Sequence, residues 1–170
     1  MAGTEIPSTP ADGNMLVLDV PAIADVDKPT IAELTASSAV DLSCYLTGDG
    51  WSPSKEQASI ADERLCSTET FERPGRKTRS LEVTYIDNTN SPYETEFNKA
   101  VDTLVEGTDH YLVTRRGVPY EEPLAVGQVV EIWPVTAGEQ REVAIEANSV
   151  TRTVQKLFVR GPVRRAVVAA

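Results

Sequence analysis

The sequence predicts a mainly β fold, a β-sandwich or barrel-like subunit that carries one flanking α-helix. Two observations lead to this fold class: several segments alternate between apolar and polar residues, and a single segment has the spacing of an amphipathic helix. The 170 residues fit one domain, with a core that buries roughly 70% of the surface of the unfolded chain. Because aromatic residues make up only 6% of the chain, we expect Val, Leu, Ile and Ala to fill that core.

The chain begins with a segment that we expect to be extended. Residues 1–13 (MAGTEIPSTPADG) are rich in Pro, Gly, Thr and Ser, which is typical of a loop. An arm of this composition would be disordered alone, so we expect a neighbouring chain to order it. We therefore divide the chain into an N-terminal arm (1–13), a β domain (14–160) and a C-terminal tail (161–170).

Alternation with a period of two residues predicts the strands of the β domain. In the segment 40–46 every second residue is apolar, and the segments 80–85 and 142–146 repeat the pattern. Such alternation is typical of strands with one buried face. The predicted strands are Met15–Asp19, Val40–Leu46, Arg64–Phe71, Ser80–Tyr85, His110–Arg116, Gln128–Val135, Arg141–Ala147 and Val150–Arg160.

Two glycine-containing segments predict turns. Gly48-Asp49-Gly50 is expected to end one strand, and the segment 136–139 is expected to join the strands 128–135 and 141–147 as a hairpin. The segment 150–160 alternates less cleanly, because charged and apolar residues share one of its faces. This favours a bulge, a strand whose surroundings change along its length, or a strand buried between subunits.

One helix is predicted after Ser91. Ser91 is a good N-cap, Pro92 suits the first helical position, and Glu94 completes a capping box. Gly107 would end this helix after about 15 residues, a length that requires packing of its apolar stripe against a sheet. The stripe consists of Tyr93, Phe97, Ala100, Val101, Leu104 and Val105.

The charge of the chain limits its partners. Its 16 basic and 26 acidic residues give a net charge of −10, so a free-standing grip on nucleic-acid phosphates is not expected. The excess of acid lies mainly in residues 1–75, whereas residues 76–170 are nearly neutral. This uneven distribution of charge suits copies that stack head to tail. Alternatively, the acidic surface only keeps the protein soluble.

Metal, membrane and cofactor sites are not predicted. His110 is the single histidine, which excludes a metal site with two imidazoles, and Cys44 and Cys66 form no CxxC pair. We expect both cysteines to be reduced, buried thiols. No segment reaches the roughly 18 apolar residues of a membrane span, and no basic residue precedes the apolar stretch 15–26, as it would in a signal peptide.

No motif predicts an enzyme. The Gly-x-Ser-x-Gly elbow is absent, and Asp109 is a poor partner for His110 because adjacent strand residues point to opposite faces. With 26 acidic residues, a pair of carboxylates that acts as in a glycosidase is not excluded. However, the aromatic residues that stack on sugars are scarce.

Small basic clusters and one tryptophan are candidates for contacts between subunits. No aromatic residues interleave the clusters, so they are poor nucleic-acid contacts. They are either solvated charge or partners for the acidic half of a neighbouring copy, and Trp51 is either a loop anchor or a contact. The clusters are Arg76-Lys77, Arg115-Arg116 and Arg164-Arg165.

The serial order of several segments carries a resemblance to a known family. They are Gly48-Asp49-Gly50-Trp51, Glu63-Arg64-Leu65, Thr70–Gly75, Leu81–Asp87, the helix after Ser91-Pro92, His110–Gly117, Val126–Val135 and the strands that follow. Over about residues 28–160, this order resembles the major tail tube protein of long-tailed, siphovirus-type bacteriophages, particularly the short form found in phages of actinobacteria. Residues 1–13 and 161–170 lie outside the resemblance.

The resemblance implies a structural virion protein rather than an enzyme. Members of the family form hexameric rings that stack into a hollow tail tube, which conducts DNA into the host cell. The implied partners are further copies of the chain, the tape-measure protein and DNA within the lumen, and tail terminator and tail-tip proteins; no membrane is involved. Assembly would take place in the host cytoplasm. Another tail component, such as a tail terminator, a tail-tip protein or a receptor-binding β-sandwich module, is the alternative.

Site residues follow from this interpretation. An acidic lumen wall would repel the phosphates of passing DNA, and Glu131, Glu142 and Glu146 are its candidates, as outward positions of the predicted hairpin. The contacts between subunits or rings are predicted at Ile6, Pro7, Trp51, Arg76, Arg115 and Arg116.

Overall fold

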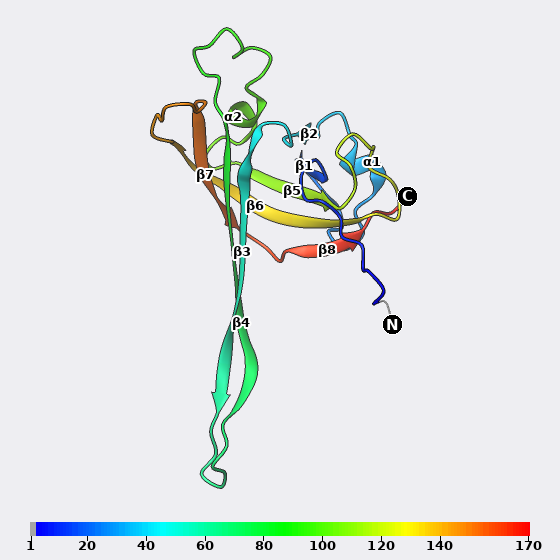
Figure 1. Ribbon diagram of the computed structural model, residues 1–170, viewed down its shortest axis with the longest axis vertical. Coiled ribbons are helices and arrows are strands. Elements are labelled where there is room, and N and C mark those ends of the chain that lie inside the picture. Colours follow the sequence, from blue (N-terminus) through cyan, green and yellow to red (C-terminus); the bar gives the residue numbers. More distant parts are fainter. Residues whose placement is uncertain (1–2) are drawn as a thin grey trace.

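The computed structural model describes residues 3–170 and confirms the mainly β fold class (Figure 1). Two short helices, α1 (Ile31–Leu34) and α2 (Lys99–Thr103), accompany the strands in this part of the chain. The strands are β1 (Met15–Val20), β2 (Val40–Asp41), β3 (Leu46–Asp62), β4 (Phe71–Ile86), β5 (Asp109–Arg116), β6 (Val129–Glu142), β7 (Arg152–Val159) and β8 (Arg164–Val167).

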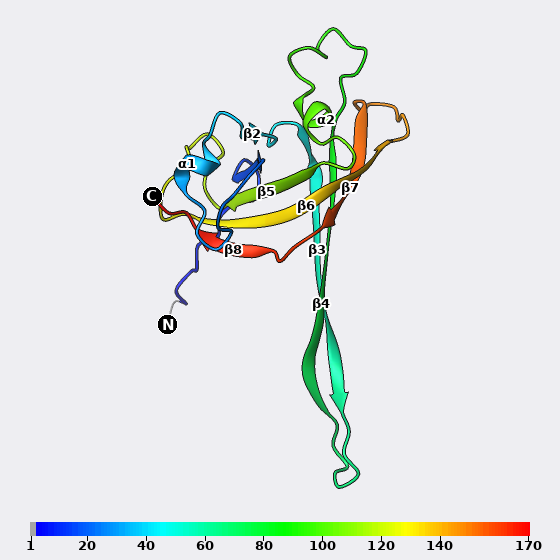
Figure 2. The same cartoon turned by 180° about the vertical axis from the view of Figure 1, so that it is seen from behind.

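The strands form one antiparallel sheet that curls into a half-barrel (Figures 1 and 2). Their order is β2-β1-β5-β6-β7-β4-β3, and β8 pairs with β6 outside this path. The long strand β6 joins the two parts of the sheet. Its first half pairs with β5 and β8, and its second half pairs with β7.

Each face of the sheet packs against its own hydrophobic cluster. Leu16 and Val17 are neighbours on β1 but belong to different clusters, because successive strand residues point to opposite faces. The cluster of Val17 lies inside the curl, since it also contains residues of β4 and β7 and is covered by Ala100 of α2. The cluster of Leu16 lies outside and is covered by Leu34 of α1.

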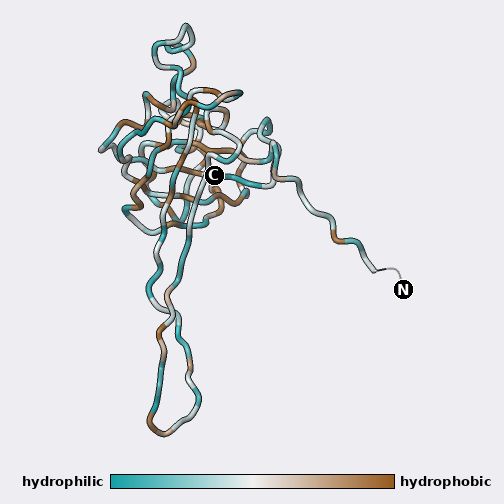
Figure 3. Tube along the Cα trace, turned by 60° about the vertical axis from the view of Figure 1, so that its left-hand side comes forward, coloured by the Kyte–Doolittle hydropathy of each residue, from teal (hydrophilic) through white to brown (hydrophobic). Residues whose placement is uncertain are grey.

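The strands β3 and β4 form a hairpin that projects far beyond the half-barrel (Figures 1 and 3). Only the segment Leu81–Ile86 of β4 pairs with β7, so the distal part of the hairpin is a two-stranded ribbon. The predicted strand Arg64–Phe71 was wrong: most of this segment is the loop at the end of the hairpin. Alternation alone did not distinguish an exposed loop from a strand.

The turn predicted at Gly48-Asp49-Gly50 was wrong. These residues lie within β3, at a register shift between Leu46 and Trp51 that is typical of a bulge. A Cβ atom on Gly50 would lie 2.1 Å from the carbonyl oxygen of Thr84, so this glycine permits close approach of β4. The strand predicted at 40–46 is reduced to β2, which ends at Asp41.

The hairpin predicted within residues 128–147 was also wrong. β6 runs continuously through Gly138, and a register shift between Ala137 and Gln140 absorbs the extra residues. A Cβ atom on Gly138 would lie 2.5 Å from the carbonyl oxygen of Lys156 on β7. The glycine therefore marks a close strand approach, and the chain turns only after Glu142.

The predicted helix is much shorter than expected. α2 begins at Lys99, and the segment 91–96 forms turns in which Ser91 Oγ accepts a hydrogen bond from the amide of Tyr93 (3.2 Å). Ala100 and Leu104 of the expected stripe are buried, whereas the side chain of Tyr93 is 62% exposed. The residues predicted to cap the helix thus form a local turn. The first half of the apolar stripe, Tyr93 and Phe97, is not covered by other described residues.

The cysteines depart from one further expectation, and the C-terminal residues take part in the sheet. Cys44 and Cys66 are free, as expected, but both are exposed rather than buried. Residues 161–170 contain β8, which pairs with β6, and Ala169 forms a parallel bridge with Thr30. The end of the chain is therefore integrated in the sheet.

In the part of the arm that the structure describes, residues 3–10 are extended and lead away from the body, and residues 11–13 form a turn next to β1 (Figure 3). Its side chains are exposed, and Ile6 is 87% exposed. The arm is anchored where it enters β1, because the amides of Tyr120 and Gly117 donate to the carbonyl oxygens of Gly13 and Asn14. Met1 and Ala2, which belong to the predicted arm, lie outside the described residues.

Candidate functional site

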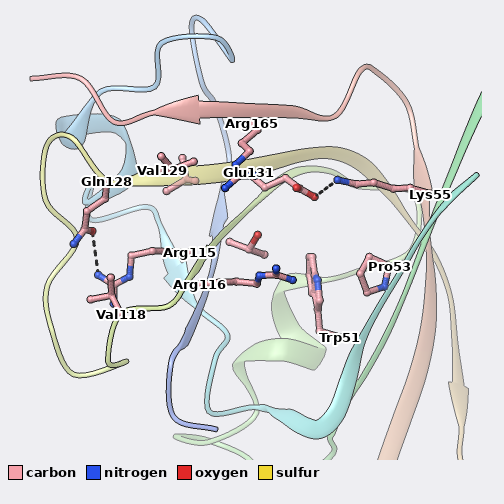
Figure 4. A pocket seen from close by; sticks show the side chains of 12 residues that line it. Trp51, Pro53, Lys55, Arg115, Arg116, Val118, Gln128, Val129, Glu131 and Arg165 are labelled. Carbon is pink, nitrogen blue, oxygen red and sulfur yellow. Dashed lines mark hydrogen bonds and ion pairs between the residues drawn. The ribbon is translucent and has the colours of Figure 1, made fainter. Parts of the chain in front are cut away.

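An open cavity of about 590 Å³ lies where β3 passes the ends of β5, β6 and β8 (Figure 4). We call it the basic pocket, because its lining combines four cationic side chains with a single carboxylate. They are Lys55, Arg115, Arg116, Arg165 and Glu131. In a chain of net charge −10 this local excess of positive charge is unusual, and it favours an anionic occupant.

One wall of the basic pocket comes from β3. Trp51, Pro53 and Lys55 all line it, because alternate residues of a strand share one face. The ring of Trp51 meets the buried ring of Trp133 edge to face, with centroids 6.2 Å apart. The ammonium group of Lys55 lies 5.4 Å from the centroid of Trp133 and forms an ion pair with Glu131 at 2.8 Å. This wall is therefore apolar at Trp51 and Pro53 and nearly neutral at Lys55.

The opposite wall carries two arginines without an ion pair. Arg116 ends β5, and Arg165 lies opposite Glu131 in the register of β8 and β6. Both are exposed, and neither forms an ion pair with another residue of the described chain. Figure 4 shows Arg116 on the side of the pocket that faces Trp51. These two guanidinium groups are free to bind a carboxylate.

Arg115 has a different role, because it is 1% exposed. Its guanidinium donates to the carbonyl oxygens of Pro119 (3.0 Å) and Glu122 (2.9 Å) and to Gln128 Oε1 (3.3 Å). Burial lowers the pKa of Arg115, and the negative charge of Glu122 partly opposes this shift. Arg115 therefore holds the loop between β5 and β6 in place and supplies positive charge beneath the pocket.

The structure brings some of the predicted site residues together and separates others. Trp51, Arg115 and Arg116 line one pocket, and Glu131 lines it too. The sequence analysis missed Lys55, and it named Arg165 only as part of a basic cluster near the C-terminus. Alternation along the strand from Trp51 through Pro53 would have predicted that Lys55 lies on the same face. The position of Arg165 depends on the pairing of β8 with β6 and could not be predicted in this way.

The remaining predicted residues are dispersed. Arg76 is exposed on the hairpin, and Ile6 and Pro7 are exposed in the arm. Glu142 is exposed at the end of β6, and Glu146 lies in the following loop with a carboxylate oxygen 3.8 Å from Arg152. The three predicted acids form no cluster within one subunit, and the hairpin on which they were predicted is absent from the described chain.

The single histidine is part of a buried hydrogen-bonded chain. His110 Nδ1 lies 2.9 Å from Asp19 Oδ1, and His110 Nε2 lies 2.6 Å from Thr108 Oγ1. The hydroxyl of Thr108 also donates to the carbonyl oxygen of Val105, which extends the chain to the end of the segment that precedes β5. Asp109, as expected, is not the partner of His110, and the arrangement joins β1 to the start of β5.

Two ends of the molecule expose apolar side chains. At the hairpin tip, which we define as residues 60–71, Ile60 and Phe71 are 55% and 56% exposed, and Leu65 is fully exposed. The acidic loop, which we define as residues 87–106, lies at the opposite end of the long axis (Figure 1) and exposes Tyr93 and Phe97. Its charged residues are Asp87, Glu94, Glu96, Asp102 and Glu106 against Lys99.

Residues 3–170 offer few other features that resemble a ligand site. No group of three side chains there is arranged to hold a metal ion, and no helix among these residues has the length and apolar character needed to cross a membrane. A second open cavity of about 440 Å³ lies at the base of the hairpin and is lined by Lys77, Arg79 and Arg160.

Comparisons with known proteins agree with the fold. The family model described as "Phage tail tube protein" matches residues 3–170. No curated protein matches the chain significantly. Among solved structures, a chain of the "Cryo-EM structure of the anti-feeding prophage (AFP) baseplate, 6-fold symmetrised" is similar with a TM-score of 0.52 at 13% identity, and the alignment covers 96% of this chain and 100% of that chain. At this identity the likeness shows the fold alone.

Proposed function

We propose that this chain, which belongs to the phage tail tube protein family, is the repeating subunit of a tail tube. In this proposal six copies form a ring, and rings stack into a hollow tube that conducts DNA into the host cell. The match over residues 3–170 supports a structural tail protein. A six-fold arrangement is named for the similar prophage baseplate, and here it is part of the proposal.

The observation that carries the stacking proposal is the exposure of apolar side chains at opposite ends of the molecule. The hairpin tip presents Ile60, Leu65 and Phe71 at one end, and the acidic loop presents Tyr93 and Phe97 at the other. A two-stranded ribbon is marginally stable in water, so the hairpin is expected to pack on a neighbour. A contact between two different ends of identical copies generates a filament when the rotation from copy to copy does not close into a ring.

Charge supports the same arrangement. The base of the hairpin, rather than its tip, carries Arg76, Lys77 and Arg79 near Arg160, and the acidic loop of a neighbouring copy would find complementary charge there. Complementary charge would align successive copies in one direction and speed their association.

The inner wall of the tube is proposed to repel DNA through carboxylates. Glu131, Glu142 and Glu146 remain the candidates, but Lys55 neutralises Glu131 at 2.8 Å. Glu142 forms no ion pair with another described residue, and Glu146 lies 3.8 Å from Arg152. Glu142 is therefore the strongest of the three candidates, since an unpaired carboxylate repels phosphate most effectively.

The proposal places the protein in the virion of a siphovirus-type phage, with actinobacterial hosts implied by the sequence resemblance. The tape-measure protein and DNA would occupy the lumen without specific binding, and tail terminator and tail-tip proteins would meet the ends of the tube. Assembly would occur in the host cytoplasm. No catalytic role or cofactor is part of this proposal.

Electron microscopy of the purified protein over a range of concentrations tests the proposal. Six-fold rings or tubes are expected, and light scattering should show mass rising with concentration. A variant lacking residues 1–13 should keep its thermal unfolding transition but polymerise poorly. A protein that stays monomeric at the highest soluble concentration would contradict the tube.

A second candidate is another tail component, because the similar solved chain belongs to a baseplate. A terminator or tail-tip protein would form a closed ring that does not stack, and a receptor-binding module would form a stable monomer or trimer. The same micrographs distinguish these outcomes, since only a tube subunit gives stacks of many rings.

A further inference from the structure

We propose that the basic pocket binds the N-terminal arm of a second copy, with Glu5 between Arg116 and Arg165 and the Ile6-Pro7 segment against Trp51 and Pro53. This inference rests on the proposed assembly of copies and names the contact through which the arm would act. Its basis is the complementary chemistry of the pocket and the arm: Arg116 and Arg165 form no ion pair, and residues 3–9 form no hydrogen bond, with other described residues of the same chain.

The pocket offers two unused cations beside an apolar wall. Arg116 and Arg165 are exposed and form no ion pair within residues 3–170, whereas Lys55 is already paired with Glu131. Trp51 and Pro53 supply the apolar surface on the other side. A volume of about 590 Å³ lies within the range that holds a segment of a few residues. The expected occupant therefore combines one carboxylate with apolar neighbours.

The arm has this composition. Glu5 is the only acid before Asp12, and Ile6 and Pro7 follow it directly. Ile6 is 87% exposed, and no hydrogen bond joins residues 3–9 to another described residue. An extended segment that contains proline loses little conformational entropy on binding, and proline commonly packs on aromatic rings in grooves.

The path of the chain favours a second copy over the same copy. Met15 pairs with Arg116, and the amide of Gly117 donates to the carbonyl oxygen of Asn14, so the arm begins at the rim of its own pocket. The turn at residues 11–13 directs the extended segment 3–10 away from the body rather than into its own pocket (Figure 3). An arm arriving from a neighbour is not limited in this way.

A zero-length cross-link tests this contact. The variant Arg165→Lys keeps the positive charge and supplies an amine, which a carbodiimide joins to a carboxylate that it touches. Equal amounts of ¹⁴N- and ¹⁵N-labelled full-length variant are mixed before assembly, and the cross-linked peptides are identified by mass spectrometry. We expect a peptide that joins Glu5 to the new amine, with about half of it carrying one label from each copy.

A charge exchange provides the second measurement. Glu5→Arg alone, and Arg116→Glu with Arg165→Glu together, should each raise the concentration at which assembly begins by roughly tenfold or more, because every subunit repeats the contact. Combining all three changes should restore assembly to within a few fold of the unmodified chain. Lys28→Glu is the control, since Lys28 is exposed outside the pocket and the change should have little effect.

The outcomes separate this inference from the proposed tube. Tubes without the Glu5 cross-link, or cross-links only within one copy, would overturn arm docking while leaving the tube intact. A charge exchange that fails to restore assembly, in variants whose circular dichroism melts match the unmodified chain, would do the same. A full-length protein that never associates would overturn the tube and the docking together.

Discussion

The half-barrel and the projecting hairpin are both antiparallel β-structure, yet they differ in what stabilises them. In the half-barrel, β5 and β6 are buried on both faces, against the inner and the outer cluster. In the distal hairpin, β3 and β4 pair with each other alone, and their side chains are mostly exposed on both faces. Backbone pairing is similar in the two regions, so burial separates a self-sufficient body from a segment that needs a neighbour.

Aromatic truncations should give the largest difference between the two regions. Trp133 is fully buried and packs against Trp51, so Trp133→Ala should lower the free energy of unfolding by about 3–5 kcal/mol. Phe71 is 56% exposed at the hairpin tip, and Phe71→Ala should change it by less than about 0.5 kcal/mol. Urea unfolding of the unassembled protein measures both.

Measurements of tube formation should show a large effect for the hairpin variant, in contrast to its small effect on the free energy of unfolding. Phe71→Ala should weaken tube formation although it leaves the monomer stable, because its side chain is available only to a neighbour. Equal losses of monomer stability in the two variants would show that the hairpin is part of the core and that the comparison is wrong.

Two glutamines make a second matched pair. Gln155 is fully buried; its amide donates to the carbonyl oxygens of Leu104 and Gly138, both at 2.8 Å, and its Oε1 accepts from the hydroxyl of Tyr85. Gln155→Leu should cost about 1–3 kcal/mol, because buried polar groups lose their partners. Gln57→Leu on the hairpin removes only an exposed contact of 3.4 Å to Gly75, and chemical denaturation should detect almost no change.

Two glycines test the bulge that joins the hairpin to the body. Gly50→Ala should destabilise the protein by roughly 1–3 kcal/mol, since the new methyl group would lie 2.1 Å from the carbonyl oxygen of Thr84. Gly48→Ala should be tolerated, because nothing lies within 4 Å of that position. Calorimetric melting temperatures compare the two, and equal values would argue against close packing at this bulge.

The smallest expected effect is a pH dependence at the end of β4. Burial raises the pKa of Asp87, but hydrogen bonds from Thr89 and Thr153 outweigh it, and the net pKa is lowered from the ordinary 3.8. The carboxylate therefore stabilises the fold above that value, and this contribution is lost as the pH falls through the lowered pKa. Asp87→Asn should cost less than about 1 kcal/mol near neutrality.

The pH series gives its own control. The difference in unfolding free energy between the unmodified chain and Asp87→Asn should shrink as the solution is acidified below pH 3.8. A difference that stays constant with pH would mean that the charge of Asp87 contributes nothing and that only the geometry of its hydrogen bonds matters.

The sequence predicted the buried strands well, because burial leaves a direct record in the residue pattern. Leu81, Val83 and Tyr85 are buried as their alternation required, and β5 and β7 lie close to their predicted bounds. The errors concentrate at glycines and exposed segments. Gly50 and Gly138 suggested turns, but each accommodates a strand that passes closely; a glycine is needed in both situations, and local sequence does not distinguish them.

The candidate site was predicted only in part for a similar reason. Trp51, Arg115 and Arg116 were singled out from local features, and they do line one pocket. Arg165 lines the same pocket only because β8 pairs with β6. Glu131 was predicted to line an open wall, but it forms an ion pair with Lys55. Such partners depend on contacts between residues that are distant in sequence.

By itself, the sequence determined the mainly β class, the acidic character, the exposed arm and which residues of the central strands face a core, since alternation and composition act locally. The tertiary structure alone decided that β6 is one continuous strand, that β3 and β4 project as a hairpin, and that four cations line one pocket with Glu131. Register and curl bring these groups together, and both arise from the packing of the whole sheet rather than from any one segment.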